Sequence, residues 1–336
     1  MKKRFLYFML FLVPSLLYSQ FGVSKVGTTA AQFLKIGVGA RAIGMGGAFV
    51  AVADDATAIY WNPAGISRLY KNEAVAIHTD WLGGMNFDFA GVVIYTPHWG
   101  NFGVSLTSLS MPEMKVRTVE EPEGTGEMFG AGDLALGLSY ARGLTDRFSI
   151  GFNLKYINQR IWHMSASTFA VDVGTLFRTD FNGMKIGMSI SNFGGKIGYN
   201  GRDILVYYDF NPDLWGDNDR IIAMLHTDRW ALPLLFRVGI SMDVVKHRNN
   251  TLTVAIDAKH PNDNTESIDI GIEYVFKWLS LRAGHSSLFM KDSEEGFTLG
   301  CGMRYPLGSS MVKLDCAYAD FGKLQNAKRL SLSFIF

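Results

Sequence analysis

Histidine and cysteine are the side chains that most often bind metals or act in catalysis, and their spacing in this sequence matches no such site. Neither a His-x-x-x-His nor a Cys-x-x-Cys pattern occurs, so the spacings typical of zinc sites are absent. Scattered histidines of this kind are typical of a protein surface or rim, and we therefore expect no metal and no cofactor. The seven histidines are His78, His98, His163, His226, His247, His260 and His285.

Covalent catalysis needs a nucleophile beside a base and an acid, and no part of the sequence singles out such a group. Cys301 and Cys316 fall on neighbouring predicted strands at nearly matching positions, and both have the parity of the apolar face. Free thiols in apolar surroundings fit this placement better than a disulfide bond, although the spacing permits one. We predict that the protein is not an enzyme.

Acidic residues recur in the segment 194–231, where clustered oxygens could bind Ca²⁺. Their spacing is not that of an EF-hand, so a solvated loop is the favoured interpretation. The segment also contains large aromatic side chains, whose exposure is costly unless they pack, so it is expected to fold over the chain or to contact a partner. The acidic residues are Asp203, Asp209, Asp213, Asp217 and Asp219, and the aromatic ones are Tyr199, Tyr207, Tyr208, Phe210 and Trp215.

Glycines cluster near the N-terminus without forming a nucleotide site. Gly37-Val38-Gly39 is followed by Gly44 rather than by a glycine three residues later, and no strand–helix unit surrounds it. A P-loop pattern is absent as well. Gly44, Gly46 and Gly47 instead indicate a backbone that packs closely against other parts of the protein.

Composition limits the class of protein. Of 336 residues, 48% are hydrophobic and 19% are charged, whereas a soluble domain has about 25% charged residues. The formal charge is +1, and it falls to −2 without the three basic residues of segment 1–19. Such a chain is not expected to bind nucleic acid.

Residues 1–19 have the three parts of a secretory signal peptide. Met1–Arg4 is basic, Phe5–Tyr18 is almost wholly apolar, and Ser19 is a small residue before a cleavage point. The apolar stretch is shorter than the roughly 20 residues that a membrane-spanning helix needs. We therefore predict export with removal of this segment.

Apolar residues alternate with polar ones over most of the remaining sequence, which is the period of β-strands. The strands would occupy near half of the chain, against about 20–25% in an ordinary globular domain. This excess favours a large barrel, sandwich or propeller. The predicted strands are 73–80, 86–95, 100–109, 130–142, 146–160, 165–179, 183–193, 232–245, 250–260, 266–275, 278–287, 295–305, 309–320 and 327–336.

The connections favour an antiparallel transmembrane β-barrel of about 14 strands over a soluble β-sandwich. Those after even-numbered strands are short, and several of those after odd-numbered strands are long, chiefly 110–129 and 194–231. Short turns at one rim and long loops at the other are typical of outer-membrane barrels of Gram-negative bacteria, and an even strand count leaves both termini on the periplasmic side. Aromatic residues near both strand ends, Trp81 and Phe87 among them, would form two belts at the membrane interfaces.

In such a barrel the polar alternate residues face the lumen. They carry both signs of charge in similar number, which suits cross-strand pairing better than a wet passage. These residues are Arg237, Asp243, Asp257, Lys259, Asp269, Glu273, Arg282, Arg304, Lys313 and Asp315.

Residues 20–72 do not alternate and are expected to fold into the mouth of the barrel as a hatch or plug. Asp54 or Asp55 can cap a short helix that continues through Trp61. Asn62-Pro63 would end it, because the residue before proline is disfavoured in the helical region. The domains would thus be 1–19 signal peptide, 20–72 hatch and 73–336 barrel.

The run from Phe33 to Gly47, Asp54-Asp55, and Tyr60-Trp61-Asn62-Pro63-Ala64-Gly65 resemble the N-terminal signature of the PorV/PorQ family. Segments 260–264, 270–274 and 281–284 also resemble the later part of that family. These proteins are outer-membrane barrels related to the FadL transporters, which carry an Asn-Pro-Ala turn in an N-terminal hatch. The resemblance implies a 14-stranded FadL-like barrel. It marks as hatch motif Gly44, Gly46, Gly47, Asp54, Asp55, Asn62, Pro63 and Ala64.

Three functions follow as hypotheses. The resemblance implies a component of type IX protein secretion, which would meet secreted cargo or other secretion components through loops 110–129 and 194–231. The alternatives are a FadL-like transporter of an apolar small ligand, with 20–72 as a movable hatch, and a structural or adhesive barrel. Outer-membrane lipid is the expected surrounding. The alternating C-terminal residues Leu332, Phe334 and Phe336 resemble a signal for the outer-membrane assembly machinery.

Overall fold

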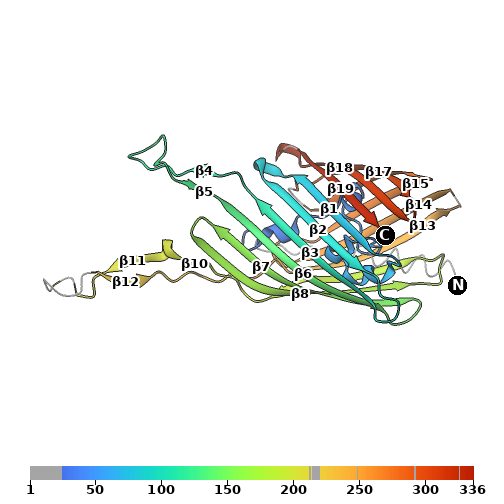
Figure 1. Cartoon of the computed structure of the whole chain (residues 1–336), viewed down its shortest axis with the longest axis horizontal. Helices are drawn as coiled ribbons and strands as arrows, with labels where there is room; N and C mark the ends of the chain where they lie inside the picture. Colours follow the sequence, from blue (N-terminus) through green and yellow to red (C-terminus); the bar gives the residue numbers. More distant parts are fainter. Residues whose placement is uncertain (1–24, 212, 214–219, 248, 291–292, 325) are drawn as a thin grey trace.

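Fourteen antiparallel strands close into a barrel in the computed structural model of this chain (Figure 1). The structure describes residues 25–336, except 212, 214–219, 248, 291–292 and 325. The wall strands are β1 (Glu73–Asp80), β2 (Asn86–Ile94), β3 (Asn101–Ser110), β6 (Ala131–Gly143), β7 (Phe148–Ile161), β8 (Met164–Arg178), β9 (Lys185–Gly194), β13 (Leu235–Lys246), β14 (Asn250–Pro261), β15 (Ser267–Phe276), β16 (Leu279–Leu288), β17 (Phe297–Leu307), β18 (Ser310–Asp320) and β19 (Asn326–Ile335).

Closure depends on pairing between the two ends of the chain. β1 pairs with β19 along its whole length, from Glu73 opposite Ile335 to Asp80 opposite Lys328. The long connection before β13 does not interrupt the wall, because β13 pairs directly with β9. A closed sheet leaves no unpaired edge, which is the condition for a sheet in lipid. The predicted antiparallel β-barrel of about 14 strands is confirmed.

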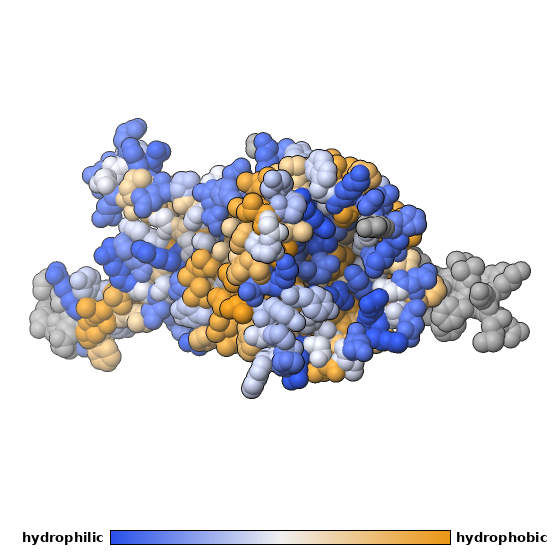
Figure 2. Space-filling model, turned by 45° about the vertical axis from the view of Figure 1, so that its right-hand side comes forward, coloured by the Kyte–Doolittle hydropathy of each residue, from blue (hydrophilic) through white to orange (hydrophobic). Residues whose placement is uncertain are grey.

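Alternate side chains of the strands point outward, and many of them are apolar; Figure 2 shows such residues as orange patches on the wall among hydrophilic ones. In the part of the chain that is described, no helix is long and apolar enough to cross a membrane. Exposed apolar side chains on different strands include Val104, Leu138, Leu154, Ile256, Ile272, Leu299 and Leu332.

The two ends of the barrel differ. Short turns join the strands at one end, where Phe336 N–H donates to the carbonyl of Asn72 at 3.0 Å and so brings the C-terminus beside the start of β1. At the other end, two ribbons extend beyond the wall (Figure 1). One pairs β4 (Met114–Lys115) with β5 (Met128–Phe129), and the other pairs β11 (Leu205–Tyr208) with β12 (Ile221–Met224). Before β11, the short strand β10 (Asn200–Gly201) pairs with β8 of the wall.

Residues 29–69, here called the inner segment, lie within the ring of strands (Figure 1). Its helices are short: η2 (Gln32–Lys35), α2 (Ala40–Gly44), α3 (Ala58–Trp61) and η3 (Pro63–Arg68), and η4 (Leu82–Gly84) follows β1. Small and apolar residues such as Val38, Ala48, Phe49 and Ala58 are fully buried against the wall. The hydrophobic core of the molecule is therefore the contact between this segment and the barrel.

Several sequence expectations need correction. The loops 110–129 and 194–231 contain the short strands of the two ribbons, which lack the long alternation used to find strands. Phe87 and Trp81 do not belong to an outer aromatic belt: Phe87 is fully buried inside, and Trp81 packs against Phe321. The helix that ends at Trp61 begins at Ala58, and its N-cap is Thr57 rather than an aspartate. The predicted signal peptide lies outside the described residues.

Candidate functional site

The inner segment is anchored to the wall by a chain of ion pairs. Arg41 contacts Asp54 at 2.5 Å and Asp55 at 2.9 Å, and it pairs with Glu273 of β15 at 2.8 Å. Glu273 also accepts from Arg282 at 2.7 Å. Burial alone would lower the pKa of Arg41, but the carboxylates of Asp54 and Glu273 raise it well above its usual value. Arg41 therefore stays charged and ties the inner segment to the strands.

The polar residues predicted for the lumen point inward, and most of them bind one another or the inner segment. Arg282 continues the ion pairs to Asp315 at 2.6 Å. The backbone N–H groups of Phe49 and Val50 donate to Asp257 at 2.7 and 2.8 Å. Three more of the predicted residues have partners on the wall: Lys259 pairs with Asp269, Lys313 with Glu73, and Asp243 with Thr253. Arg237 lies over the rings of Tyr60 and Trp61. Arg304 lines a small space beside Arg41.

The predicted Asn-Pro-Ala turn lies against β7 and β8. The Asn62 side-chain amide donates to the carbonyls of Val50 and Thr175 at 2.9 and 3.0 Å, and its oxygen accepts from Ala64 N–H at 3.2 Å. Pro63 and Ala64 begin η3 directly after it. The Asn62 side chain thus makes hydrogen bonds with three backbone groups at the point where the inner segment meets the wall.

Glycines on the strands make room for this turn, and the sequence analysis did not single them out. A Cβ at Gly174 would collide with the Asn62 side chain, and one at Gly151 would collide with the backbone of Pro63. Both glycines occupy strand positions whose side chains would point inward. This alternation was the signal in the sequence that could have identified them.

The three predicted hatch glycines lie against the opposite wall. Gly44 would place a Cβ 3.0 Å from the backbone of Gly300. Gly46 has a φ of +66° and donates its N–H to Thr298 Oγ1 at 2.9 Å. Gly47 also has positive φ, at +83°. A side chain at Gly46 would collide with the β16 backbone, so the close approach expected of these glycines is present.

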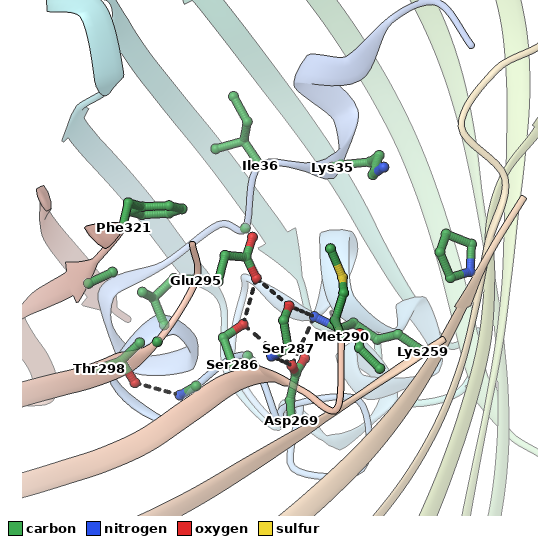
Figure 3. A pocket seen from close by; sticks show the side chains of 18 of the residues that line it. Lys35, Ile36, Lys259, Asp269, Ser286, Ser287, Met290, Glu295, Thr298 and Phe321 are labelled. Carbon is green, nitrogen blue, oxygen red and sulfur yellow. Dashed lines mark hydrogen bonds and ion pairs between the residues drawn. The ribbon is translucent and has the colours of Figure 1, made fainter. Parts of the chain in front are cut away.

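A cavity of about 210 Å³ lies between the inner segment and the wall, toward the end that bears the ribbons. Figure 3 shows Glu295 pointing at the hydroxyl groups of Ser286 and Ser287, from which it accepts at 3.0 and 2.5 Å. Ser287 N–H donates to Asp269 at 2.8 Å. Phe321 and Ile36 provide apolar lining on other sides. This space can hold a small molecule with both polar and apolar parts.

The two ribbons differ in chemistry (Figure 2). The β4–β5 ribbon is mainly hydrophilic, whereas β11–β12 exposes apolar side chains on both of its faces. Tyr207 is 75% exposed, and its cross-strand partner Ile222 is 67% exposed. The other exposed apolar residues of this ribbon and its continuations are Leu205, Val206, Tyr208, Phe210, Ile221, Met224 and Leu225.

The predicted acidic loop is only partly described. Asp203 contacts His163 at 3.1 Å, Asp209 accepts from Asn211 N–H at 2.9 Å, and Asp213 is exposed. Asp217, Asp219 and Trp215 lie outside the described residues. Of the residues placed by the structure, no three among His, Cys, Asp and Glu form a group that could hold a metal ion.

The histidines lie apart from one another, whereas the two cysteines are cross-strand neighbours. His78 contacts Asp88 on the outer face, and His260 contacts Glu266 at 3.0 Å. Cys301 and Cys316 lie opposite each other on β17 and β18, and both are free and exposed on the outer face.

Solved structures similar to this chain include a FadL homologue and two toluene transporters, all of low sequence identity. A FadL homologue of Pseudomonas aeruginosa matches with a TM-score of 0.53 at 12% identity, over 89% of this chain and 98% of the other. The toluene transporter TbuX of Ralstonia pickettii matches with 0.54 at 10% identity, over 89% and 97%. The toluene transporter TodX of Pseudomonas putida matches with 0.53 at 12% identity, over 89% and 97%. These matches show a shared fold.

No curated protein matches the sequence. The family described as type IX secretion system protein PorV matches residues 20–224, which confirms the resemblance seen in the N-terminal motifs. Secretion and transport, rather than catalysis, are the activities of PorV and FadL-like barrels. Together with the barrel fold, the match places the protein in the outer membrane of a Gram-negative bacterium. The chain belongs to the PorV family of type IX secretion system proteins.

Proposed function

We propose that this barrel is a component of type IX secretion that binds a partner protein at the cell surface through its β11–β12 ribbon. The observation that carries the proposal is the exposure of apolar side chains on both faces of this ribbon. The family match supports secretion as the process, and it implies other secretion components and secreted cargo as partners.

The location of the ribbon argues for a protein partner. The ribbon extends beyond the wall at the rim opposite the one where β1 begins and β19 ends. Its apolar residues are therefore not part of the membrane-facing band (Figure 1). Large apolar groups exposed to water mark interaction sites. Because both faces are apolar, a partner that encloses the ribbon covers more of it than a flat surface would.

The test compares paired substitutions in the two ribbons. Tyr207→Ser with Ile222→Ser removes one cross-strand apolar pair from β11–β12, and Lys115→Ser with Met128→Ser changes the matching pair of β4–β5. Tagged full-length protein is recovered from its native cells, and the co-purified secretion components and cargo are quantified by mass spectrometry.

We expect the β11–β12 variant to recover at least about tenfold less partner, because truncation of a central aromatic anchor costs about 2 kcal/mol or more and about 1.4 kcal/mol is a tenfold change in affinity. The β4–β5 variant should recover the wild-type amount. Heat-dependent mobility on a gel shows that each barrel is folded. Equal recovery by both variants would contradict the proposal.

Transport of small apolar molecules is a second candidate. Its support is the fold shared with toluene transporters and the cavity beside the inner segment. The inner segment would then act as a movable hatch. Toluene uptake by intact cells, whose lipopolysaccharide layer slows passive entry, measures this activity, and equal rates in cells with and without the protein would exclude it.

A further inference from the structure

Arg329 of β19 is a buried cation without a hydrogen-bond partner for two of its nitrogens. Its side chain lines the cavity beside the inner segment, and only 4% of the residue is exposed. Among the residues that the structure describes, neither Nε nor Nη1 has a hydrogen-bond acceptor. A buried guanidinium normally satisfies its N–H groups, so Arg329 has unused hydrogen-bond donor capacity beside the cavity that it lines.

The acidic side chains that line the cavity have other hydrogen-bond partners, and Glu295 acts on Arg329 only by electrostatic attraction. Asp269 pairs with Lys259 at 2.8 Å, Glu295 accepts from Ser286 and Ser287, and Asp320 accepts from the N–H of Gly322 at 3.0 Å. Arg329 instead lies over the ring of Trp81, 5.3 Å from its centroid. The aromatic ring contributes attraction to the cation but no hydrogen-bond acceptor.

Charge and size restrict the ligand. Four basic and three acidic side chains line the cavity, which favours a single negative charge over two. The volume of about 210 Å³ is below the roughly 300–1,000 Å³ of sites for drug-sized ligands. Trp81 and Phe321 pack edge to face at 5.4 Å and provide an apolar wall next to the guanidinium.

We propose that this cavity binds a small organic monocarboxylate, with its carboxylate on Arg329 and its apolar part against Trp81 and Phe321. A carboxylate binds one edge of a guanidinium by accepting from Nη2 together with either Nε or Nη1, a charge-assisted geometry that a neutral ligand lacks. This binding site goes beyond the proposed role in secretion and does not depend on it.

Benzoate and benzyl alcohol are matched probes, because they share the ring and differ in the charged group. Calorimetry on the purified full-length barrel in detergent at pH 7 should show benzoate binding at least about tenfold tighter than benzyl alcohol, because only the carboxylate accepts charge-assisted hydrogen bonds from Arg329. Arg329→Gln should weaken benzoate by a similar factor and leave benzyl alcohol unchanged. Lys328→Gln is the matched control, because Lys328 directly precedes Arg329 in the strand and points outward.

Three results would overturn the proposal: no benzoate binding by folded wild-type protein, equal affinity for both probes, or unchanged benzoate affinity in Arg329→Gln. Competition by inorganic phosphate as strong as that by benzoate would also overturn it, because it would show a site for any anion. If Arg329→Gln does not fold, Arg329→Lys keeps the charge without the planar fork and should still weaken benzoate. The β11–β12 substitutions should leave benzoate affinity unchanged, which separates this site from the proposed function.

Discussion

Individual side chains hold the inner segment by contacts that span long distances in sequence. Asp263, between β14 and β15, accepts from Thr29, Gln32 and Lys35 at 2.6, 2.7 and 2.9 Å. Burial would raise the pKa of Asp263, but these three hydrogen bonds and the Lys35 charge hold it below its usual value. The folded state therefore favours the ionised carboxylate.

This sign gives a prediction for acid. A lowered pKa in the folded state stabilises the contact at neutral pH, and the stabilisation is lost as the pH falls below about 3.9 and through the lowered value. We expect hydrogen–deuterium exchange of residues 29–35 to be slow at pH 7 and to increase in that acid range, after correction for the intrinsic rate. Asp263→Asn should exchange fast already at pH 7. Glu266→Gln, in the same loop but exposed, should behave as wild type, and equal protection in all three proteins would refute the assignment.

Gly174 gives a second prediction at this scale. Alanine at this position places its Cβ against Asn62 and within 2.8 Å of Pro63 Cδ, so we expect the free energy of unfolding to fall by about 1–3 kcal/mol. Urea titration of the detergent-solubilised barrel measures it. Gly143→Ala is the control, because its nearest atom lies at 3.7 Å, and it should change stability little. A Gly174→Ala protein as stable as the control would show that the turn shifts without cost.

Among the elements, β19 has the largest influence on closure, because it pairs with β1 on one side and β18 on the other. Its last residues carry the apolar alternation of Leu332, Phe334 and Phe336. We predict that deletion of Phe334–Phe336 abolishes membrane insertion, since it removes the partners of Ala74 and Val312 together with the proposed assembly signal. Membrane fractionation and heat-dependent gel mobility are the measurements. Normal insertion of the shortened chain would show that the terminal residues are dispensable.

At the scale of the whole molecule, the proposed partner binding and the proposed movement of the inner segment can be tested separately. Thr29 forms a backbone bridge to Ala231, so cysteines at these positions lie within reach of a disulfide. In a background of Cys301→Ser and Cys316→Ser, we expect oxidised Thr29→Cys/Ala231→Cys protein to capture partners as the reduced form does. If capture falls on oxidation and returns with reductant, partner binding requires the inner segment to move. Toluene entry blocked by the same disulfide would support a movable hatch.

The local pattern determined most of the wall. Each of the 14 strands was predicted within a few residues of its observed bounds. Successive side chains of a strand face lipid and interior in turn, so the alternation of apolar and polar residues is visible in short stretches of sequence. The same parity placed Arg282 and Asp315 on the inner face. Glycine spacing and Asn62-Pro63 likewise marked the segment that meets the wall.

Only the tertiary structure decided which inward residues meet. Arg41 and Glu273 are 232 positions apart, and their contact exists because β1 and β19 close the barrel around the inner segment. Closure also turned Trp81 under Arg329 and left that guanidinium facing a cavity, whereas the sequence suggested an outer aromatic belt. The apolar ribbon β11–β12 escaped prediction since it is short and lacks a buried face. Parity is a property of neighbouring residues, but a binding site depends on distances between residues far apart in the chain.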